Sequence, residues 1–117
     1  GQVNTAYNTL KSSLTRAQYL LELAGQQRAP ETTLHDSVFL IEQMELRERL
    51  DESAKNIDAL DALLVDVKKT IREYEQFFAA AWKKSDWPQA KLMVDKLQFA
   101  TKLAHEIDDR QARLLDD

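Results

Sequence analysis

The sequence contains no cysteine and only two glycines and two prolines in 117 residues. Without cysteine, the chain cannot form disulfides or a thiolate-bound zinc or iron–sulfur site. Two isolated glycines also exclude glycine-rich phosphate loops and the nucleophile elbows of hydrolases. So few helix breakers, together with 31% charged and 44% hydrophobic residues, predict a nearly all-helical soluble protein.

A basic charge excess and long apolar runs are also absent. The net charge of −4, with acidic and basic residues interleaved, argues against nucleic acid as the main partner and against membrane binding. No apolar run approaches the roughly 20 residues of a transmembrane helix, and residues 1–10 do not resemble a signal peptide. The chain begins at Gly1, inside a helical pattern, so we expect it to be part of a longer protein.

Apolar residues spaced by three and four predict a first helix over residues 3–23. Gly25 is in position to end this helix, and Pro30 cannot continue one. Residues 24–33 are therefore predicted to be a linker.

Three further helices are predicted to form a bundle. The first of them covers residues 36–53, and the next begins at Ile57 and runs for about 27 residues. A short turn at residues 84–88 makes the last helix its antiparallel neighbour. The predicted core stripe of the long helix is Ile57, Leu60, Leu64, Val67, Ile71, Tyr74, Phe78 and Ala81. The last helix carries a main stripe and, beside it, a second one formed by Leu92, Phe99 and Leu103. The predicted fold is all-α: a three-helix bundle over residues 34–117, preceded by one helix.

Residues 36–53 carry more apolar surface than one core can use. On a helical wheel, one sector contains Phe39, Gln43, Leu46, Leu50 and Ala54. The opposite sector combines three aliphatic residues with three carboxylates: Leu40, Ile41, Met44, Glu45, Glu48 and Glu52. This second sector is either a partner-binding patch or a surface covered by another helix, and periodicity leaves both interpretations open.

Groups suited to catalysis or metal binding are scarce. His35 lies at a helix start and His105 on a late, charged turn, so both are expected to be surface residues. The segment that begins at His105 starts like a zincin motif but has Asp109 where the second histidine is needed. No Glu-x-x-His pair occurs, and Glu42 and Glu45 are better explained as solvated charges. We therefore expect no enzyme activity, no cofactor and no metal.

Two segments resemble a known family. Residues 3–10 together with 16–21 resemble the final J-domain helix of HscB-type co-chaperones. Residues 39–48 resemble the signature of that family's C-terminal domain, and the order and spacing agree through residues 96–99. The resemblance implies an L-shaped protein with a C-terminal three-helix bundle, and it makes residues 1–23 the last helix of a truncated J-domain.

The resemblance also implies a function. Proteins of this type bind the IscU-type scaffold on which iron–sulfur clusters are built and deliver it to a dedicated DnaK-type chaperone, HscA. Carried over position by position, the family's scaffold-binding surface falls on Leu40, Ile41, Met44, Glu45, Glu48, Glu52 and Phe99. Six of these form the second sector of residues 36–53, so the resemblance favours partner binding there. The bacterial members of the family make the cytoplasm the expected location.

The sequence departs from the family in one functional motif. A J-domain needs a His-Pro-Asp loop to stimulate the chaperone's ATPase, and these 117 residues contain none. We therefore expect scaffold binding to be kept and ATPase stimulation to be lost. Without the other J-domain helices, an apolar face of the first helix is left uncovered; it is formed by Tyr7, Leu10, Leu14 and Leu20. That face is expected to contact the bundle, a second copy of the chain, or J-domain residues beyond this sequence.

Two other interpretations remain open. A structural helical module without a chaperone role could self-associate through residues 57–81 and through the uncovered apolar face of the first helix. A carboxylate-bridged metal bundle would need several inward carboxylates. An apolar interior around Leu60, Leu64 and Ile71 would exclude that second alternative.

Overall fold

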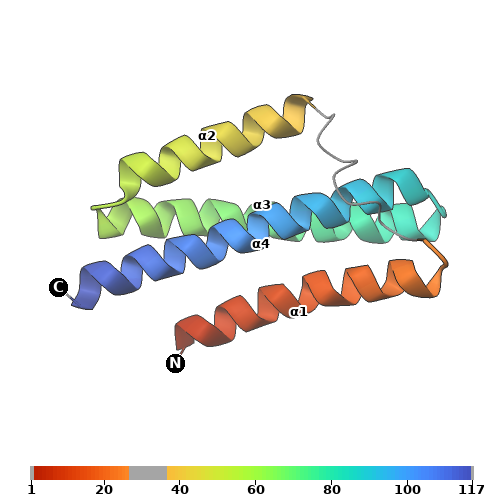
Figure 1. The fold of residues 1–117 in the computed structure, drawn as a ribbon, viewed down its shortest axis with the longest axis horizontal. Helices are drawn as coiled ribbons and strands as arrows, with labels where there is room; N and C mark the ends of the chain where they lie inside the picture. Colours follow the sequence, from red (N-terminus) through yellow and green to blue (C-terminus); the bar gives the residue numbers. More distant parts are fainter. Residues whose placement is uncertain (1, 27–36, 117) are drawn as a thin grey trace.

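The computed structural model describes residues 2–26 and 37–116, with side chains from residue 11 onward. These residues form four helices, α1 (Gln2–Leu23), α2 (Ser37–Ser53), α3 (Ile57–Lys83) and α4 (Trp87–Asp116) (Figure 1). The described ranges contain no strand, and the all-α prediction is confirmed. The predictions for His35, Pro30 and most of the linker fall outside the described residues.

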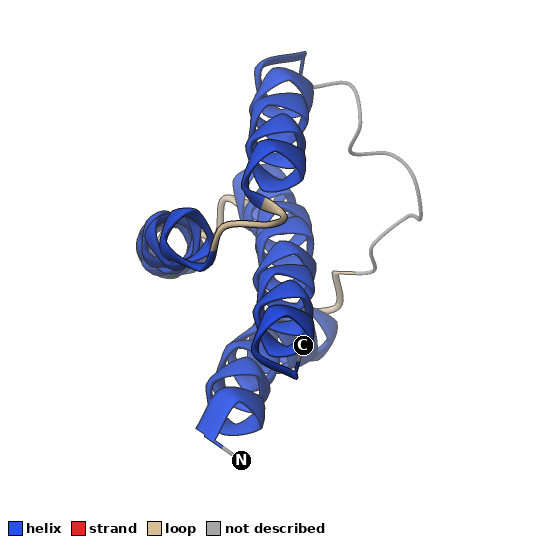
Figure 2. Ribbon diagram, turned by 90° about the vertical axis from the view of Figure 1, so that its left-hand side faces the viewer, coloured by secondary structure: helices blue, strands red, loops and turns tan. Residues whose placement is uncertain are grey.

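The antiparallel pair α3 and α4 forms the centre of the fold. Helix α2 packs against both members of this pair, and these three helices form the bundle. Helix α1 packs mainly against α4 and lies on the opposite side of the central pair from α2 (Figures 1 and 2). The two peripheral helices therefore present separate surfaces of the molecule.

Local sequence signals set the helix ends. Gly25 adopts a φ of 76°, the left-handed conformation that closes the C-terminus of α1. The Asn56 side chain caps α3, because its Oδ1 accepts a hydrogen bond from the Ala59 N–H at 3.1 Å. Asp86 does the same for α4, accepting from the Gln89 N–H at 3.2 Å. These caps account for the sharp turns that make α2, α3 and α4 successive neighbours.

The core lies along α3 and α4 and follows most of the predicted stripes. Two positions of the predicted α3 stripe differ. Ile57, in the first turn of α3, is only partly buried. Leu63 is fully buried, whereas the predicted Leu64 is only partly buried. The reason is that α3 contacts helices on two sides, so its buried arc is wider than a single stripe. Of the second stripe on α4, Leu103 is fully buried, while Leu92 and Phe99 are partly buried.

The apolar face of α1 that the missing J-domain helices would leave uncovered packs against the bundle. Ala17 and Leu21 are buried, and Leu14 and Leu20 pack against the same core. Contact with the bundle was one of the three predicted outcomes for this face. The side chains of Tyr7 and Leu10 are outside the described set.

The interior around Leu60 and Ile71 is apolar, and Asp108 is the one buried carboxylate among the described residues, so the metal-bundle alternative lacks the several inward carboxylates that it requires. Within residues 2–26 and 37–116, no three His, Cys, Asp or Glu side chains gather in an arrangement able to hold a metal ion. None of the described helices combines the length and apolar character needed to cross a membrane.

Candidate protein-binding surface

Six of the seven predicted site residues lie together on the outer face of α2. We define the outer face as Leu40, Ile41, Met44, Glu45, Glu48 and Glu52. Of its aliphatic side chains, Met44 is 70% exposed, Ile41 is 55% exposed and Leu40 is 36% exposed. The three carboxylates are exposed as well. None of the described helices covers this face, so the interpretation of these residues as core is wrong.

The opposite side of α2 explains why the outer face is free. Phe39 and Leu50 are 2% and 1% exposed, and they lie three helical turns apart on the side that contacts α3 and α4. With these residues fixed in the core, the positions on the far side of the wheel point away from α3 and α4. Exposed side chains as large as Ile41 and Met44 on one helix are a typical mark of an interaction surface.

Phe99 differs from the other six predicted residues because it is partly buried. Its ring meets that of Phe39 edge-on, with centroids 5.8 Å apart, and the Arg47 guanidinium lies 6.0 Å from its centroid. Phe99 therefore helps to hold α2 on α4 and also lies beside the residue that precedes Leu40. It forms the border between the core and the outer face.

Ion pairs orient α2 and shape the charge of its outer face. Arg47 pairs with Glu106 of α4 at 2.5 Å, and Arg49 pairs with Asp66 of α3 at 2.7 Å. Each such half-exposed pair adds only about 0.2–1 kcal/mol, but together they fix the rotation of α2. Both arginines are directed at the bundle, so the outer face contains three carboxylates and no cation.

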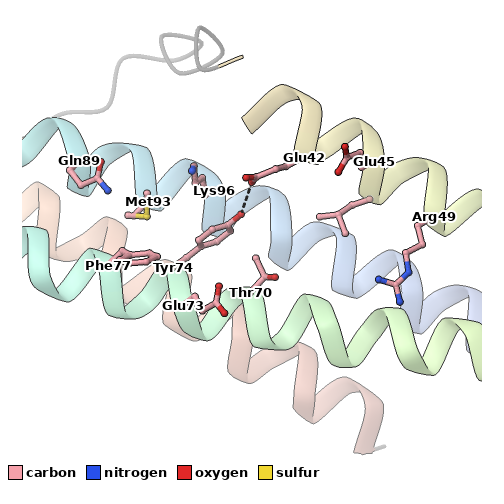
Figure 3. Close-up of a pocket in the computed structure, with 11 residues that line it drawn as sticks. Glu42, Glu45, Arg49, Thr70, Glu73, Tyr74, Phe77, Gln89, Met93 and Lys96 are labelled. Carbon is pink, nitrogen blue, oxygen red and sulfur yellow. Dashed lines mark hydrogen bonds between the residues drawn. The ribbon is translucent and has the colours of Figure 1, made fainter. Parts of the chain in front are cut away.

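A cleft of about 580 Å³ lies between α2 and the α3–α4 pair (Figure 3). We call it the α2 cleft; its lining includes Glu42, Glu45, Glu73, Tyr74, Phe77 and Lys96. Glu45 belongs to both the cleft and the outer face. Tyr74 was predicted only as a core residue, yet its hydroxyl donates a 3.4 Å hydrogen bond to the Glu42 carboxylate. This contact joins residues 32 positions apart, so no local sequence pattern could have indicated it.

The α2 cleft raises the pKa of Tyr74 to about 12. Burial is the largest cause, followed by the negative charge of Glu42, the hydrogen bond to Glu42 and the charge of Glu73. All four disfavour the phenolate, because it would be both desolvated and close to like charges.

The raised pKa predicts that the Tyr74 phenol stabilises the fold below pH 10 and that this contribution is lost as the pH rises through 12. The sign follows because the unfolded chain deprotonates near 10 while the folded chain keeps its proton. Over this range, the unfolding free energy of the unaltered chain should fall by about 2 kcal/mol more than that of Tyr74→Phe. Urea titrations at several pH values measure this difference. Parallel curves for the two proteins would contradict the prediction.

Comparison with known proteins identifies relatives of the chain. Residues 35–108 match the family model described as the HSCB C-terminal oligomerisation domain. The chain is 40% identical over 111 residues to the co-chaperone protein HscB homolog of Vibrio vulnificus (strain YJ016), covering 92% of this chain and 65% of that protein. It is 42% identical over 118 aligned positions to the homolog of Vibrio cholerae serotype O1 (strain M66-2), covering 97% and 69%. The chain thus spans about two thirds of the length of these curated relatives. The matched range includes the whole outer face and Phe99.

Proposed function

The chain belongs to the HscB family, and on this premise we propose that it is a co-chaperone of iron–sulfur cluster biogenesis. It binds an IscU-type scaffold protein through the outer face of α2 and Phe99, and presents that scaffold to a dedicated DnaK-type chaperone of the HscA type. The observation that carries the proposal is the exposure of Leu40, Ile41 and Met44 on a helix whose other side is buried.

The outer face has the two parts that a protein interface needs. Burial of its aliphatic side chains against an apolar patch would contribute about 25 cal/mol for each Å² removed from water. The carboxylates Glu45, Glu48 and Glu52 favour a basic partner surface and set its orientation. Only part of this gain becomes affinity, because association also costs translational and rotational entropy.

We further propose that residues 1–23 are the last helix of a J-domain, joined by residues 24–33 to the scaffold-binding bundle over 34–117. Ala17 and Leu21 of α1 are buried in the bundle, so a J-domain carried by α1 would be held against it. Because α1 and α2 lie on opposite sides of the α3–α4 pair, the chaperone and the scaffold could bind at the same time (Figure 2).

The proposed role is that of a cytoplasmic binding protein and not of an enzyme. The 117 residues contain no His-Pro-Asp motif, so they should bind the scaffold without stimulating the ATPase of the chaperone. Scaffold binding therefore has to be measured directly and cannot be inferred from ATPase rates.

Isothermal titration of the chain with a purified IscU-type scaffold tests the proposal. We expect saturable 1:1 binding with a negative heat-capacity change, because apolar surface is buried. ATP hydrolysis by the chaperone should not respond to this chain. No binding of the scaffold, combined with concentration-dependent sedimentation of the chain alone, would favour the self-associating module instead.

A further inference from the structure

We propose that the α2 cleft is a second contact site for the docked scaffold and receives one of its arginine side chains. This inference rests on the proposed function, since the scaffold is the protein that supplies the arginine. It adds to the outer face a pocket with its own shape and charge, formed by α2, α3 and α4 (Figure 3).

The cleft offers an aromatic surface to a flat cation. Phe77 lines it and is 54% exposed, an unusual position for a phenylalanine on a bundle helix. The Tyr74 ring lies next to it in the same lining (Figure 3). A guanidinium group stacks well on an exposed ring such as that of Phe77 and can bind a carboxylate through two parallel hydrogen bonds, which a lysine ammonium cannot do.

The charges that line the cleft favour an incoming cation. Three carboxylates line it, those of Glu42, Glu45 and Glu73, and within the described parts of the chain neither Glu45 nor Glu73 forms an ion pair. Two cations line it as well, but each is already engaged. Arg49 pairs with Asp66 at 2.7 Å.

The second cation, Lys96, lies over two aromatic rings. Its Nζ is 5.4 Å from the ring centroid of Phe39 and 5.6 Å from that of Tyr74. With Lys96 held by these rings and Arg49 held by its ion pair, the carboxylates on the α2 and α3 walls keep acceptor capacity for a guanidinium. Burial is the main cause of the raised pKa of Tyr74, and the negative charges of Glu42 and Glu73 add to it.

The position of the cleft connects it to the outer face. Glu45 lines the cleft and also lies among the exposed residues of the outer face. A protein docked on Ile41 and Met44 therefore needs to extend only past Glu45 to reach the aromatic wall. The arginine would stack on Phe77 and pair with Glu73.

Scaffold affinity of cleft variants, measured by isothermal titration, tests the inference. Phe77→Ala and Glu73→Gln should each weaken binding about twofold to fivefold, since a partly exposed cation–π contact or charge pair is worth up to about 1 kcal/mol. Matched controls are Val65→Ala, an exposed apolar residue of the same helix, and Glu22→Gln, an exposed carboxylate on α1. The controls should bind as the unaltered chain does.

Double-mutant cycles identify the chemistry of the partner group. Exposed arginines of the scaffold are replaced one at a time by glutamine and combined with Glu73→Gln. One arginine should show a coupling of about twofold to fivefold, and replacing that arginine by lysine should restore only part of the affinity.

The outcomes separate this inference from the proposed function. Binding that is unaffected by Phe77→Ala and Glu73→Gln but lost on changes to Met44 overturns the cleft inference and leaves the outer face in place. Equal losses in the controls, or coupling to no scaffold arginine, also overturn it. If the unaltered chain does not bind the scaffold, both proposals fall.

Discussion

The double variant Leu40→Ala/Met44→Ala is expected to bind an IscU-type scaffold about 2–4 kcal/mol more weakly than the unaltered chain. Both side chains are exposed in the free protein, at 36% and 70%, so the loss should come from contacts made only in the complex. Most of the loss should be seen as faster dissociation. Isothermal titration and stopped-flow binding measure the two quantities.

The same variant should keep the helicity and the unfolding free energy of the unaltered chain to within about 0.5 kcal/mol, because exposed positions add little to the core. A suitable control is Val65→Ala with Leu115→Ala, which removes exposed apolar groups from α3 and α4 and should not change affinity. A large drop in thermal stability of the Leu40/Met44 variant would mean that these side chains are part of the core, and the outer face would lose its proposed role.

Leu103→Ala is expected to have the opposite profile, lowering the unfolding free energy by about 2–5 kcal/mol. Leu103 is 0% exposed and belongs to the core, so alanine there leaves a cavity among neighbours that cannot fully collapse. Leu115→Ala, at a 76% exposed position on the same helix, should change stability by less than about 0.5 kcal/mol. Urea unfolding followed by circular dichroism measures both variants.

Scaffold affinity provides a second measurement for the Leu103 variant. Where it remains folded, it should bind the scaffold as the unaltered chain does, because Leu103 does not reach the outer face. A variant that lost affinity but not stability would place Leu103 at an interface and would contradict the described packing of α4.

Most of the fold could be predicted because its signals are local. Spacings of three and four residues predict α3 and α4, and Asn56 and Gly25 are at the helix ends where such residues are favoured. The error at Leu63 and Leu64 has a tertiary cause. A sequence stripe does not show how many helices a given helix will contact, and α3 contacts more than one.

The outer face could be predicted in part. The wheel separates Met44 from Phe39, but it cannot determine whether a second helix covers Met44, since coverage depends on the arrangement of distant segments. Phe99 could not be assigned from the sequence either, because its stripe on the helix is compatible with a core or a surface position. In the structure Phe99 is partly buried and contacts the Phe39 ring and the Arg47 guanidinium.

The α2 cleft could not be predicted from the sequence at all. Its main contacts join residues of α2, α3 and α4 that are far apart in the sequence and follow no helical periodicity. Examples are the hydrogen bond from Tyr74 to Glu42 and the position of Lys96 over the Tyr74 ring. In the sequence, Glu42 looks like an ordinary solvated charge. Only the packing of α2 on the central pair gives it a neighbour.

The most direct test of the outer face is a methyl-detected NMR titration of the chain with an unlabelled IscU-type scaffold. The methyl signals of Leu40, Ile41 and Met44 should shift or broaden in proportion to scaffold bound, while those of Leu23 and Leu115, exposed elsewhere, should stay unchanged. Changes confined to α1 or to the end of α4, with the three outer-face residues unaffected, would contradict the account.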